Sequence, residues 1–291
     1  MDRLIRTITK DGSLMAIAAD SSDIALVAHQ VHHTSPVASA ALGRLLTGAA
    51  LMGALLKGPG SSVTVKMNGG GPLGSVVAIG DGRGHVRGYV QNPGTQLPVR
   101  GDGKLDVGGG IGKNGLMAVI RDFGEGEPYI GQARLVSGEV AEDITSYYAT
   151  SEQIPTACAL GVLVDRDRSV KVAGGYLLQL LPGAPEDIID RLEAGIRKAG
   201  AVTPMLEAGL TPEDILGQVC GDLGVVFMDT TEVEYRCYCS RDRVEQALIS
   251  LGRKELSEIR DEGKTFPVEC QFCDHVYEFT PEDIQNLLDK L

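Results

Sequence analysis

The first 180 residues alternate between apolar and polar positions with two different periods. A period of two predicts strands with one buried face, and a period near 3.6 predicts amphipathic helices. Strands are predicted at residues 4–8, 14–18, 63–67, 76–79, 86–90, 116–120, 129–136, 158–164 and 170–180, the last two apolar enough to be central strands. Helices are predicted at 23–33, 36–57 and 140–148. Because the helices are grouped rather than strictly alternating with strands, the pattern indicates a strand-rich α+β domain.

The tetrapeptide Pro-Glu-Asp-Ile occurs three times after residue 182, beginning at Pro185, Pro212 and Pro281. Proline loses no hydrogen bond at the first helical position, and two acids in the first turn complement the helix dipole. We therefore expect a helix to begin at each proline, with Thr211 and Thr280 as N-caps of the second and third. Between 186 and 223 this pattern predicts short helices joined by glycines.

The composition changes again in the last sixty residues, which carry 8 Lys and Arg against 14 Asp and Glu from residue 231 onward. So small and polar a segment can barely build an apolar core, and very small domains usually need a cross-link. The sequence therefore predicts three parts. They are an α+β N-terminal domain at 1–182, a helical connector at 183–230 and a small C-terminal zinc-binding domain at 231–291.

Four of the six cysteines lie in this last part as two close pairs, Cys237 with Cys239 and Cys270 with Cys273. Four thiolates can enclose one tetrahedral ion, and softness and geometry favour zinc. The same sulfurs can instead form two short-range disulfides. The spacing leaves open whether the site is a permanent structural zinc or a switch, in which oxidation removes the ligands and unfolds the domain.

The chain around the first cysteine pair has two further features. Arg236, Arg241 and Arg243 flank the pair and would offset part of the negative charge of a four-thiolate centre, although they fit ordinary solvated side chains equally well. Thirty residues separate Cys239 from Cys270, enough for a helical excursion over 240–262.

Other candidate ligands carry weaker signals. His275 follows Cys273 by two residues, but four thiolates already fill a zinc site. His29 and His33 have a metal-binding spacing without the glutamate that usually accompanies it. Single cysteines at 158 and 220 are expected to be buried, inert thiols.

No catalytic constellation stands out. The glycine-rich stretch 108–114 resembles a phosphate-binding loop, but Val107 stands where the motif needs its first glycine and Asn114 where it needs Ser or Thr. No Ser-His-Asp or paired-carboxylate arrangement is visible. We predict a protein that is not an enzyme and uses no cofactor besides zinc.

Charge and hydropathy limit which partners and which cellular compartment we expect for the protein. A net charge of −12 argues against nucleic-acid binding, which needs basic surface. The most apolar stretch, 37–56, is interrupted by Arg44 and is expected to be a buried helix rather than a membrane span. No secretory signal is visible. These features predict a cytoplasmic protein, and thiols kept reduced there are metal-binding or redox-active rather than structural disulfides.

The chain resembles the family of 33-kDa heat-shock chaperones along essentially its full length. Around the cysteines, the resemblance rests on residues 235–241, 268–273 and 277–279. Elsewhere it rests on residues 34–36, 68–69, 89–93 and 147–156. The order and spacing of all four cysteines match the pattern of that family.

This resemblance implies an ATP-independent holdase that is inactive while reduced and zinc-bound. It implies that peroxide or hypochlorous acid, often with heat, converts Cys237 with Cys239 and Cys270 with Cys273 into disulfides and releases one zinc ion per chain. The redox-switch domain and the connector would then unfold and expose apolar surface. A homodimer would form, and unfolding client proteins would be held in solution.

Two other classes of function remain open from the residues alone. The first is a thiol-disulfide oxidoreductase using Cys270 and Cys273, but such a motif normally opens a helix, and 268–279 is predicted to be a hairpin. Reduction of insulin by dithiothreitol would identify that activity. The second is a zinc-ribbon adaptor for nucleic acid or protein, which the acidic charge opposes for nucleic acid. Salt-dependent retention on DNA would detect it.

Overall fold

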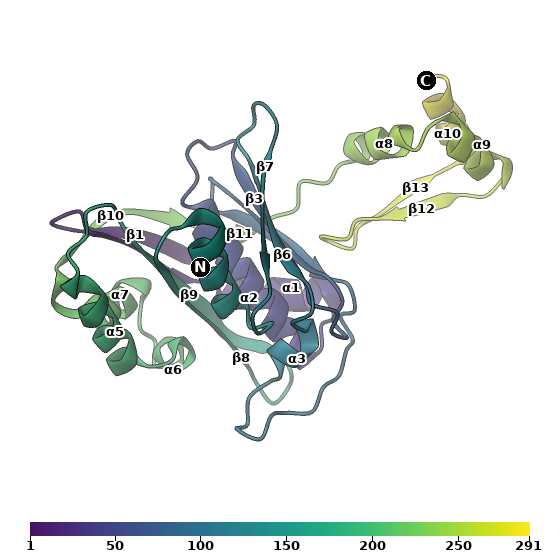
Figure 1. The fold of residues 1–291 in the computed structure, drawn as a ribbon. Coiled ribbons are helices and arrows are strands. Elements are labelled where there is room, and N and C mark those ends of the chain that lie inside the picture. Colours follow the sequence, from purple (N-terminus) through teal and green to yellow (C-terminus); the bar gives the residue numbers. More distant parts are fainter. The chain divides into compact units, whose positions relative to one another are not determined.

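A computed structural model describes residues 1–291, and these residues fall into two compact units (Figure 1). The large unit spans Met1–Arg236 and the small unit spans Cys237–Leu291. Strands and helices are mixed as the periodicity indicated, so the predicted α+β class is confirmed. The predicted division into three parts, with boundaries after residues 182 and 230, stays a prediction.

One sheet of the large unit has five antiparallel strands in the order β10-β1-β2-β9-β8. Their bounds are β1 Arg3–Thr9, β2 Leu14–Asp20, β8 Thr156–Val164, β9 Val170–Leu180 and β10 Val225–Glu232. The prediction of a central strand at 158–164 was wrong, because β8 lies at the sheet edge. The strand is apolar for a different reason. One of its faces packs into the core around α2, and the other face packs against α6.

The second sheet has six strands in the order β11-β5-β4-β3-β6-β7. Their bounds are β3 Ser62–Asn68, β4 Val76–Asp81, β5 His85–Val90, β6 Leu116–Asp122, β7 Tyr129–Arg134 and β11 Glu234–Tyr235. All neighbours run antiparallel except β11, which pairs in parallel with β5. Thus β10 and β11, only one residue apart in the chain, add an edge strand to each of the two sheets.

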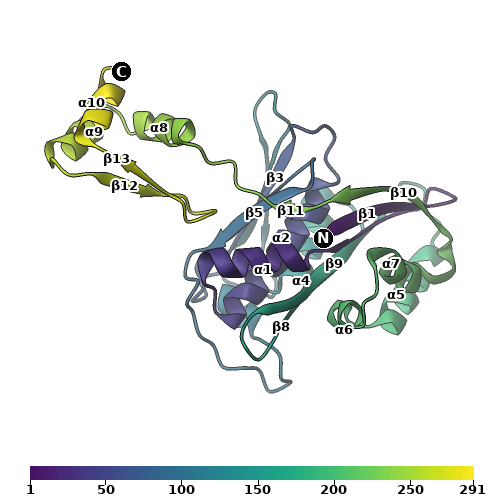
Figure 2. The ribbon, with the colours of Figure 1, turned by 180° about the vertical axis from the view of Figure 1, so that it is seen from behind.

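Helix α2, Pro36–Gly53, lies in the core of the large unit, and α1, Ser22–His32, packs beside it (Figure 2). Every residue of α2 except Pro36 and Arg44 is buried, which confirms the predicted buried helix; it ends four residues before the predicted Lys57. Three short helical segments complete this layer, α3 Val107–Ile111, α4 Val140–Tyr147 and a π-helical turn at Tyr148–Glu152. None of the helices is both long and apolar enough to cross a bilayer.

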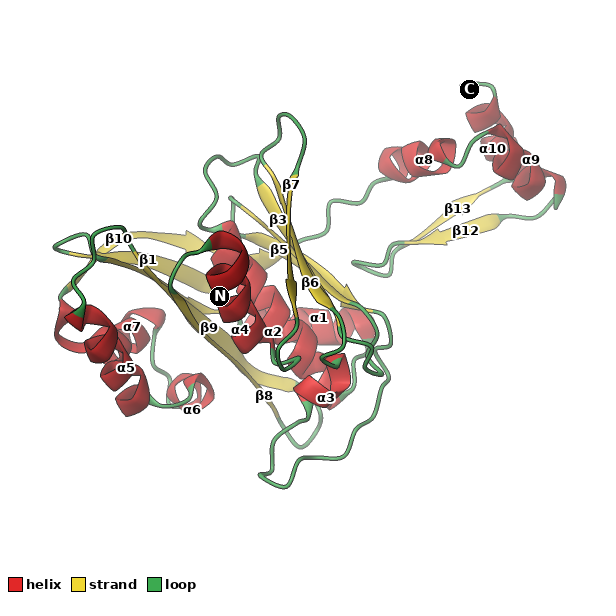
Figure 3. Ribbon diagram, viewed as in Figure 1, coloured by secondary structure: helices red, strands yellow, loops and turns green.

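The predicted connector forms α5 Asp187–Ala199, α6 Val202–Glu207, α7 Pro212–Cys220 and a 3-10 turn at Gly221–Leu223. The three helices lie together on one side of the five-stranded sheet (Figure 3). They cover a second apolar cluster to which the sheet contributes Ile5, Leu14, Ala16, Ala18, Tyr176 and Leu178. This face is opposite to the one that packs on α2, so both faces of the sheet are buried.

The small unit contains α8 Arg241–Ser250, α9 Arg253–Asp261, the hairpin β12 Phe266–Glu269 and β13 Val276–Phe279, and α10 Pro281–Leu288. The helical excursion predicted over 240–262 is confirmed; it consists of two helices, separated at Gly252, which has a positive φ of 88°. The predicted hairpin is confirmed. Only six apolar residues are buried in this unit, Leu248, Leu256, Phe279, Ile284, Leu287 and Leu288.

Candidate metal centre

The structure brings all four predicted cysteines of the small unit together. Cys237 and Cys239 lie in the segment before α8, and Cys270 and Cys273 lie in the loop between β12 and β13. The Sγ atoms of Cys237 and Cys270 are 3.7 Å apart, and those of Cys239 and Cys273 are 3.4 Å apart. All four sulfurs lie within 4.8 Å of one another. These distances are those of free thiols, not of disulfides.

Backbone hydrogen bonds hold the second pair in a tight turn. The carbonyl oxygen of Cys270 accepts from the N–H groups of Cys273 at 3.2 Å and Asp274 at 2.8 Å. Asp274 has a left-handed φ of 57°, which reverses the chain, and the N–H of Cys270 then donates to the carbonyl of His275. The turn therefore presents two sulfurs only three residues apart toward the same point.

The first pair is arranged by its own backbone and by the start of α8. The N–H of Cys239 donates to Sγ of Cys237 at 3.4 Å. Ser240 then caps α8 by accepting from the N–H of Arg243. The helix thus begins directly after Cys239, which fixes the direction in which the chain leaves the cluster.

The electrostatics of the four thiols call for a cation. Burial raises the pKa of Cys237 to about 11 and raises the pKa of Cys273 still further. Burial also acts to raise the pKa of Cys239, but hydrogen bonds outweigh it, led by that from the Tyr277 hydroxyl at 3.2 Å, and the pKa falls below its usual value. Four neighbouring thiols cannot all lose their protons without a counter-charge, because each thiolate repels the next.

The donor set fits a four-coordinate thiolate site. Bonds of about 2.3 Å to a tetrahedral ion place sulfurs about 3.8 Å apart. The separations of 3.4 and 3.7 Å in the structure, with no pair beyond 4.8 Å, are close to that value. A bound divalent cation would remove the protons that burial otherwise retains. Four cysteines in this arrangement could hold one metal ion.

Other residues near the cluster have structural roles. Arg241 lies 3.2 Å from a carboxylate oxygen of Asp283 and 4.4 Å from the centre of the Phe279 ring, so its charge is already balanced within the small unit. The imidazole of His275 packs edge-to-face on Tyr277 and is not one of the clustered ligands. Tyr277 was not among the predicted site residues. It belongs to the stretch 277–279 that carries part of the resemblance, and in the hairpin it pairs with Val268.

The remaining histidine and cysteine candidates lie in the large unit, away from any cluster of possible metal ligands. His29 Nδ1 lies 3.2 Å from the Thr34 hydroxyl and 3.1 Å from that of Ser39, at the end of α1. Cys158 in β8 and Cys220 at the end of α7 lie in apolar surroundings, and burial raises their pKa values to about 12 and about 11. The expected burial is confirmed for Cys220, whereas Cys158 is half-buried, and the inertness of both thiols stays a prediction.

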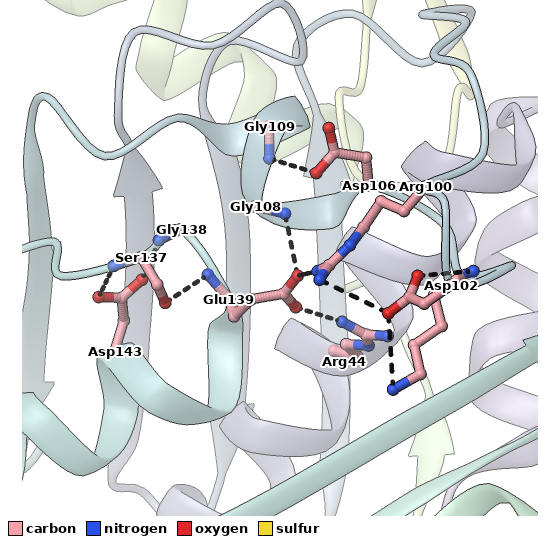
Figure 4. Close-up of polar contacts among 11 residues, drawn as sticks. Arg44, Arg100, Asp102, Asp106, Gly108, Gly109, Ser137, Gly138, Glu139 and Asp143 are labelled. Carbon is pink, nitrogen blue, oxygen red and sulfur yellow. Dashed lines mark hydrogen bonds and ion pairs between the residues drawn. The ribbon is translucent and has the colours of Figure 1, made fainter.

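The glycine-rich stretch 108–114 is a structural element whose amide groups are already occupied. Asp106 accepts from the N–H of Gly109 at 2.9 Å, and Glu139 accepts from the N–H of Gly108 at 3.2 Å (Figure 4). Figure 4 also shows Glu139 between the guanidinium groups of Arg44 and Arg100. The carboxylates of Asp106 and Glu139 therefore accept the backbone N–H groups that would bind the phosphate in a phosphate-binding loop.

Comparisons with known proteins agree over the whole chain. Residues 2–280 match the family described as Hsp33 protein. A protein named 33 kDa chaperonin from Agathobacter rectalis is 46% identical over 98% of this chain and 99% of its own length. Another of that name from Clostridium acetobutylicum is 45% identical over 100% and 98%. The crystal structure of the 33 kDa chaperonin, an Hsp33 homologue, from Thermotoga maritima superposes with a TM-score of 0.90 at 36% identity, covering 99% of this chain and 98% of that one.

Proposed function

The chain belongs to the Hsp33 family of chaperones, and from that premise we propose that it is a redox-regulated, ATP-independent holdase. The observation that carries the proposal is the cluster of four thiols in a unit with only six buried apolar residues. A unit that depends on one metal cross-link for its stability should unfold when that cross-link is lost.

In the resting state, Cys237, Cys239, Cys270 and Cys273 hold one zinc ion as thiolates. Through a bound zinc ion, which would offset two of their four negative charges, these cysteines would join the segment before α8 to the hairpin loop. The donation from the Tyr277 hydroxyl and the N–H of Cys239 stabilise sulfur in its charged form. Soft thiolate donors in a tetrahedral arrangement favour zinc over hard cations.

Activation is a four-electron oxidation by peroxide. One thiolate of a pair attacks a peroxide oxygen, which gives a sulfenic acid and hydroxide. The thiolate of the second cysteine then attacks the sulfenic sulfur, the sulfur–oxygen bond breaks, hydroxide leaves and a disulfide forms. Two molecules of hydrogen peroxide convert the four cysteines into two disulfides. We propose the pairs Cys237–Cys239 and Cys270–Cys273, each of which closes within its own segment.

The activated form exposes the apolar cluster beneath the connector. Once the ligands are oxidised, the small unit unfolds, and we propose that α5, α6 and α7 then separate from the five-stranded sheet. The face that includes Ile5, Leu14 and Tyr176 becomes available to apolar segments of unfolding client proteins. A second copy of the chain can cover part of the same surface, so a homodimer is the expected oxidised state.

The proposed setting is the cytoplasm. There the four thiols stay reduced until an oxidant appears, which a switch requires. The partners are unfolding proteins, and we propose no enzymatic activity. The location of Cys270 after β12, rather than at a helix start, favours this function over a disulfide oxidoreductase.

The decisive experiment follows metal and chaperone activity in the same sample. Reduced protein with one zinc per chain is treated with peroxide at elevated temperature. Zinc release is measured with a coloured chelator, together with light scattering of a heat-unfolded client. We expect release and protection to rise together and both to reverse with dithiothreitol and zinc. Zinc release without protection of the client contradicts the proposal.

Peptide mapping tests the disulfide pairing. Sulfur contacts of 3.7 and 3.4 Å run between the segments, from Cys237 to Cys270 and from Cys239 to Cys273. Disulfides within the segments therefore require the cluster to come apart as it is oxidised. Trypsin cleaves after arginines such as Arg241 and Arg260, which lie between the two cysteine pairs. It should therefore yield one peptide with the disulfide Cys237–Cys239 and another with the disulfide Cys270–Cys273. The variant carrying Cys158→Ser and Cys220→Ser is the matched control and should respond as the wild type does. Linked peptides would contradict the pairing.

A further inference from the structure

The two-residue strand β11, Glu234–Tyr235, ends one residue before the boundary of the large unit, and Cys237 is the first residue beyond it. It pairs in parallel with β5, and its backbone is held at both ends. The N–H of Glu234 donates to the carbonyl of Gly84 at 3.1 Å, and the N–H of Arg236 donates to that of Val86 at 2.8 Å. This strand is therefore the last element of the large unit before the chain enters the small unit (Figure 2).

The side chain of Tyr235 adds to this anchorage. Its ring packs against the main apolar core, and its hydroxyl donates to the carbonyl oxygen of Gly88 at 2.9 Å. The same hydroxyl lies 3.1 Å from Nε2 of His32, which itself lies 2.9 Å from that carbonyl. Three elements, α1, β5 and β11, thus meet at one hydroxyl group.

The residues upstream of Tyr235 connect this anchor to the connector. Val233 is buried, and its N–H donates to the carbonyl of Asp2 at 3.1 Å. Before it comes β10, an edge strand with the exposed residues Val226, Phe227 and Met228 and an irregular register against β1. The connector helices lie between β9 and β10 in sequence, so β10 and β11 form the downstream attachment of the helices that cover the second apolar cluster.

From this geometry we propose that Tyr235 is a positioning residue of a latch, formed by β11 on β5, that couples the state of the metal centre to the closure of the connector helices over the five-stranded sheet. While the cluster is metal-bound, the chain leaving β11 is restrained on both sides. When the small unit unfolds, β11 becomes the end of a structured segment and frays as termini do. The inference rests on the proposed function for its biological meaning, but the coupling is a property of the fold.

Hydrogen exchange of the reduced, zinc-loaded full-length chain tests the latch directly. Tyr235→Phe removes the hydroxyl and keeps the ring in the core. We expect amide exchange in Val225–Glu232 and in Asp187–Cys220 to accelerate about five-fold, the effect of one lost hydrogen bond, with zinc content unchanged. The matched control is Tyr129→Phe, an exposed tyrosine on β7 at the opposite edge of the same sheet. It should leave exchange in these segments unaltered.

A second variant loosens the latch without touching the tyrosine. A Cβ at Gly84 would lie 2.3 Å from the carbonyl oxygen of Glu232, so Gly84→Ala should push the β10–β11 segment away and accelerate exchange in the same two segments. Gly103→Ala is its control, since Gly103 has a similar φ of 80° but nothing within 4 Å of its Cβ position.

The possible results separate the latch from the chaperone function. Wild-type exchange rates in both Tyr235→Phe and Gly84→Ala, with zinc retained, overturn the latch. Loss of zinc from Tyr235→Phe also overturns it, because the hydroxyl would then support the metal centre itself. Accelerated exchange in a protein that never protects a client after oxidation supports the latch and contradicts the proposed function. With both correct, Tyr235→Phe should become active at lower temperature or with less peroxide than the wild type.

Discussion

A buried carboxylate near the N-terminus performs a task that no local sequence signal reveals. Helix α1 begins after Ser21, whose side chain makes no capping hydrogen bond. The carboxylate of Asp2 caps the helix instead, accepting from the N–H groups of Asp23 at 3.0 Å and Ile24 at 2.7 Å. Asp2 is only 4% exposed, and burial raises its pKa to about 6, with the nearby Asp20 and Asp23 adding to the shift.

This raised pKa predicts an unusual pH dependence. The ordinary value is 3.8, so between about pH 4 and pH 6 the folded chain binds more protons at Asp2 than the unfolded chain. Stability from this residue is therefore present at low pH and is lost as the pH rises through 6. Asp2→Asn keeps an acceptor but does not titrate. Relative to this variant, the wild type should lose about 1 kcal/mol of unfolding free energy between pH 5 and pH 7.5.

Urea denaturation of both proteins at the two pH values provides the check. Comparing the two proteins at each pH cancels contributions from other titrating groups, including the cysteines. An unchanged difference between wild type and variant at the two pH values would show that Asp2 ionises normally in the folded chain.

At the scale of elements, a second prediction uses a cysteine as a reporter. Cys220 lies at the end of α7 in the cluster beneath the connector, whereas Cys158 lies in β8 against the main core. If oxidation releases the connector, Cys220 should become accessible to an alkylating reagent after treatment with peroxide and heat, and Cys158 should stay protected. Mass spectrometry of the alkylated peptides measures both sites in one sample. Equal protection of both cysteines in the active protein contradicts release of the connector.

A third prediction concerns the contact between α2 and β4. Gly80 in β4 passes so close to α2 that a Cβ would lie 2.2 Å from the carbonyl oxygen of Ala49. Gly80→Ala should therefore force the helix away from the sheet and lower the unfolding free energy by about 3 kcal/mol. Gly94 has open space at its Cβ position, so Gly94→Ala should change stability by less than about 0.5 kcal/mol. Denaturant unfolding of the large unit measures both, and similar values for the two would contradict the close packing.

Elements whose signals are local were predictable from the sequence. Pro212 and Pro281 begin helices as expected, because Thr211 and Thr280 form capping boxes with the acids that follow. The first copy failed: α5 begins at Asp187, two residues after Pro185. Ala184, which stands where the other copies have threonine, offers no side-chain oxygen to cap a helix there.

Elements that depend on distant partners were not predictable. The segment after residue 224 becomes β10 because it pairs with β1, more than two hundred residues away, and β11 is a strand only through β5. The same distinction holds at the site. The cysteine spacing showed which four residues would meet, but the contact of Tyr277 with Cys239 depends on the hairpin register and on the path of the chain before α8.

The two units of the whole molecule differ in what holds them together. The large unit has two extended apolar clusters on either side of a sheet, and the small unit has one cluster of six buried residues with an excess of acidic side chains. Metal binding contributes about 10–16 kcal/mol of apparent folding free energy in zinc-finger peptides. Whole domains are stable by only about 5–15 kcal/mol. The small unit should therefore depend on its metal, and the sheets of the large unit should not.

Removing the metal from the reduced protein tests this difference without any oxidation. With a strong chelator at neutral pH and 25 °C, we expect α8, α9 and α10 to unfold while both sheets of the large unit persist, apart from fraying at the edge strand β11. Trypsin should then cut first after Arg236 or Arg241 and leave a fragment that contains the large unit, identified by its intact mass. Added zinc should restore resistance in the wild type and in Cys158→Ser, but not in Cys273→Ser, which lacks one ligand. Continued protection of Arg253 and Arg260 in the metal-free chain would show that the six apolar residues suffice to fold the unit, and the cluster of thiols could then not control its unfolding.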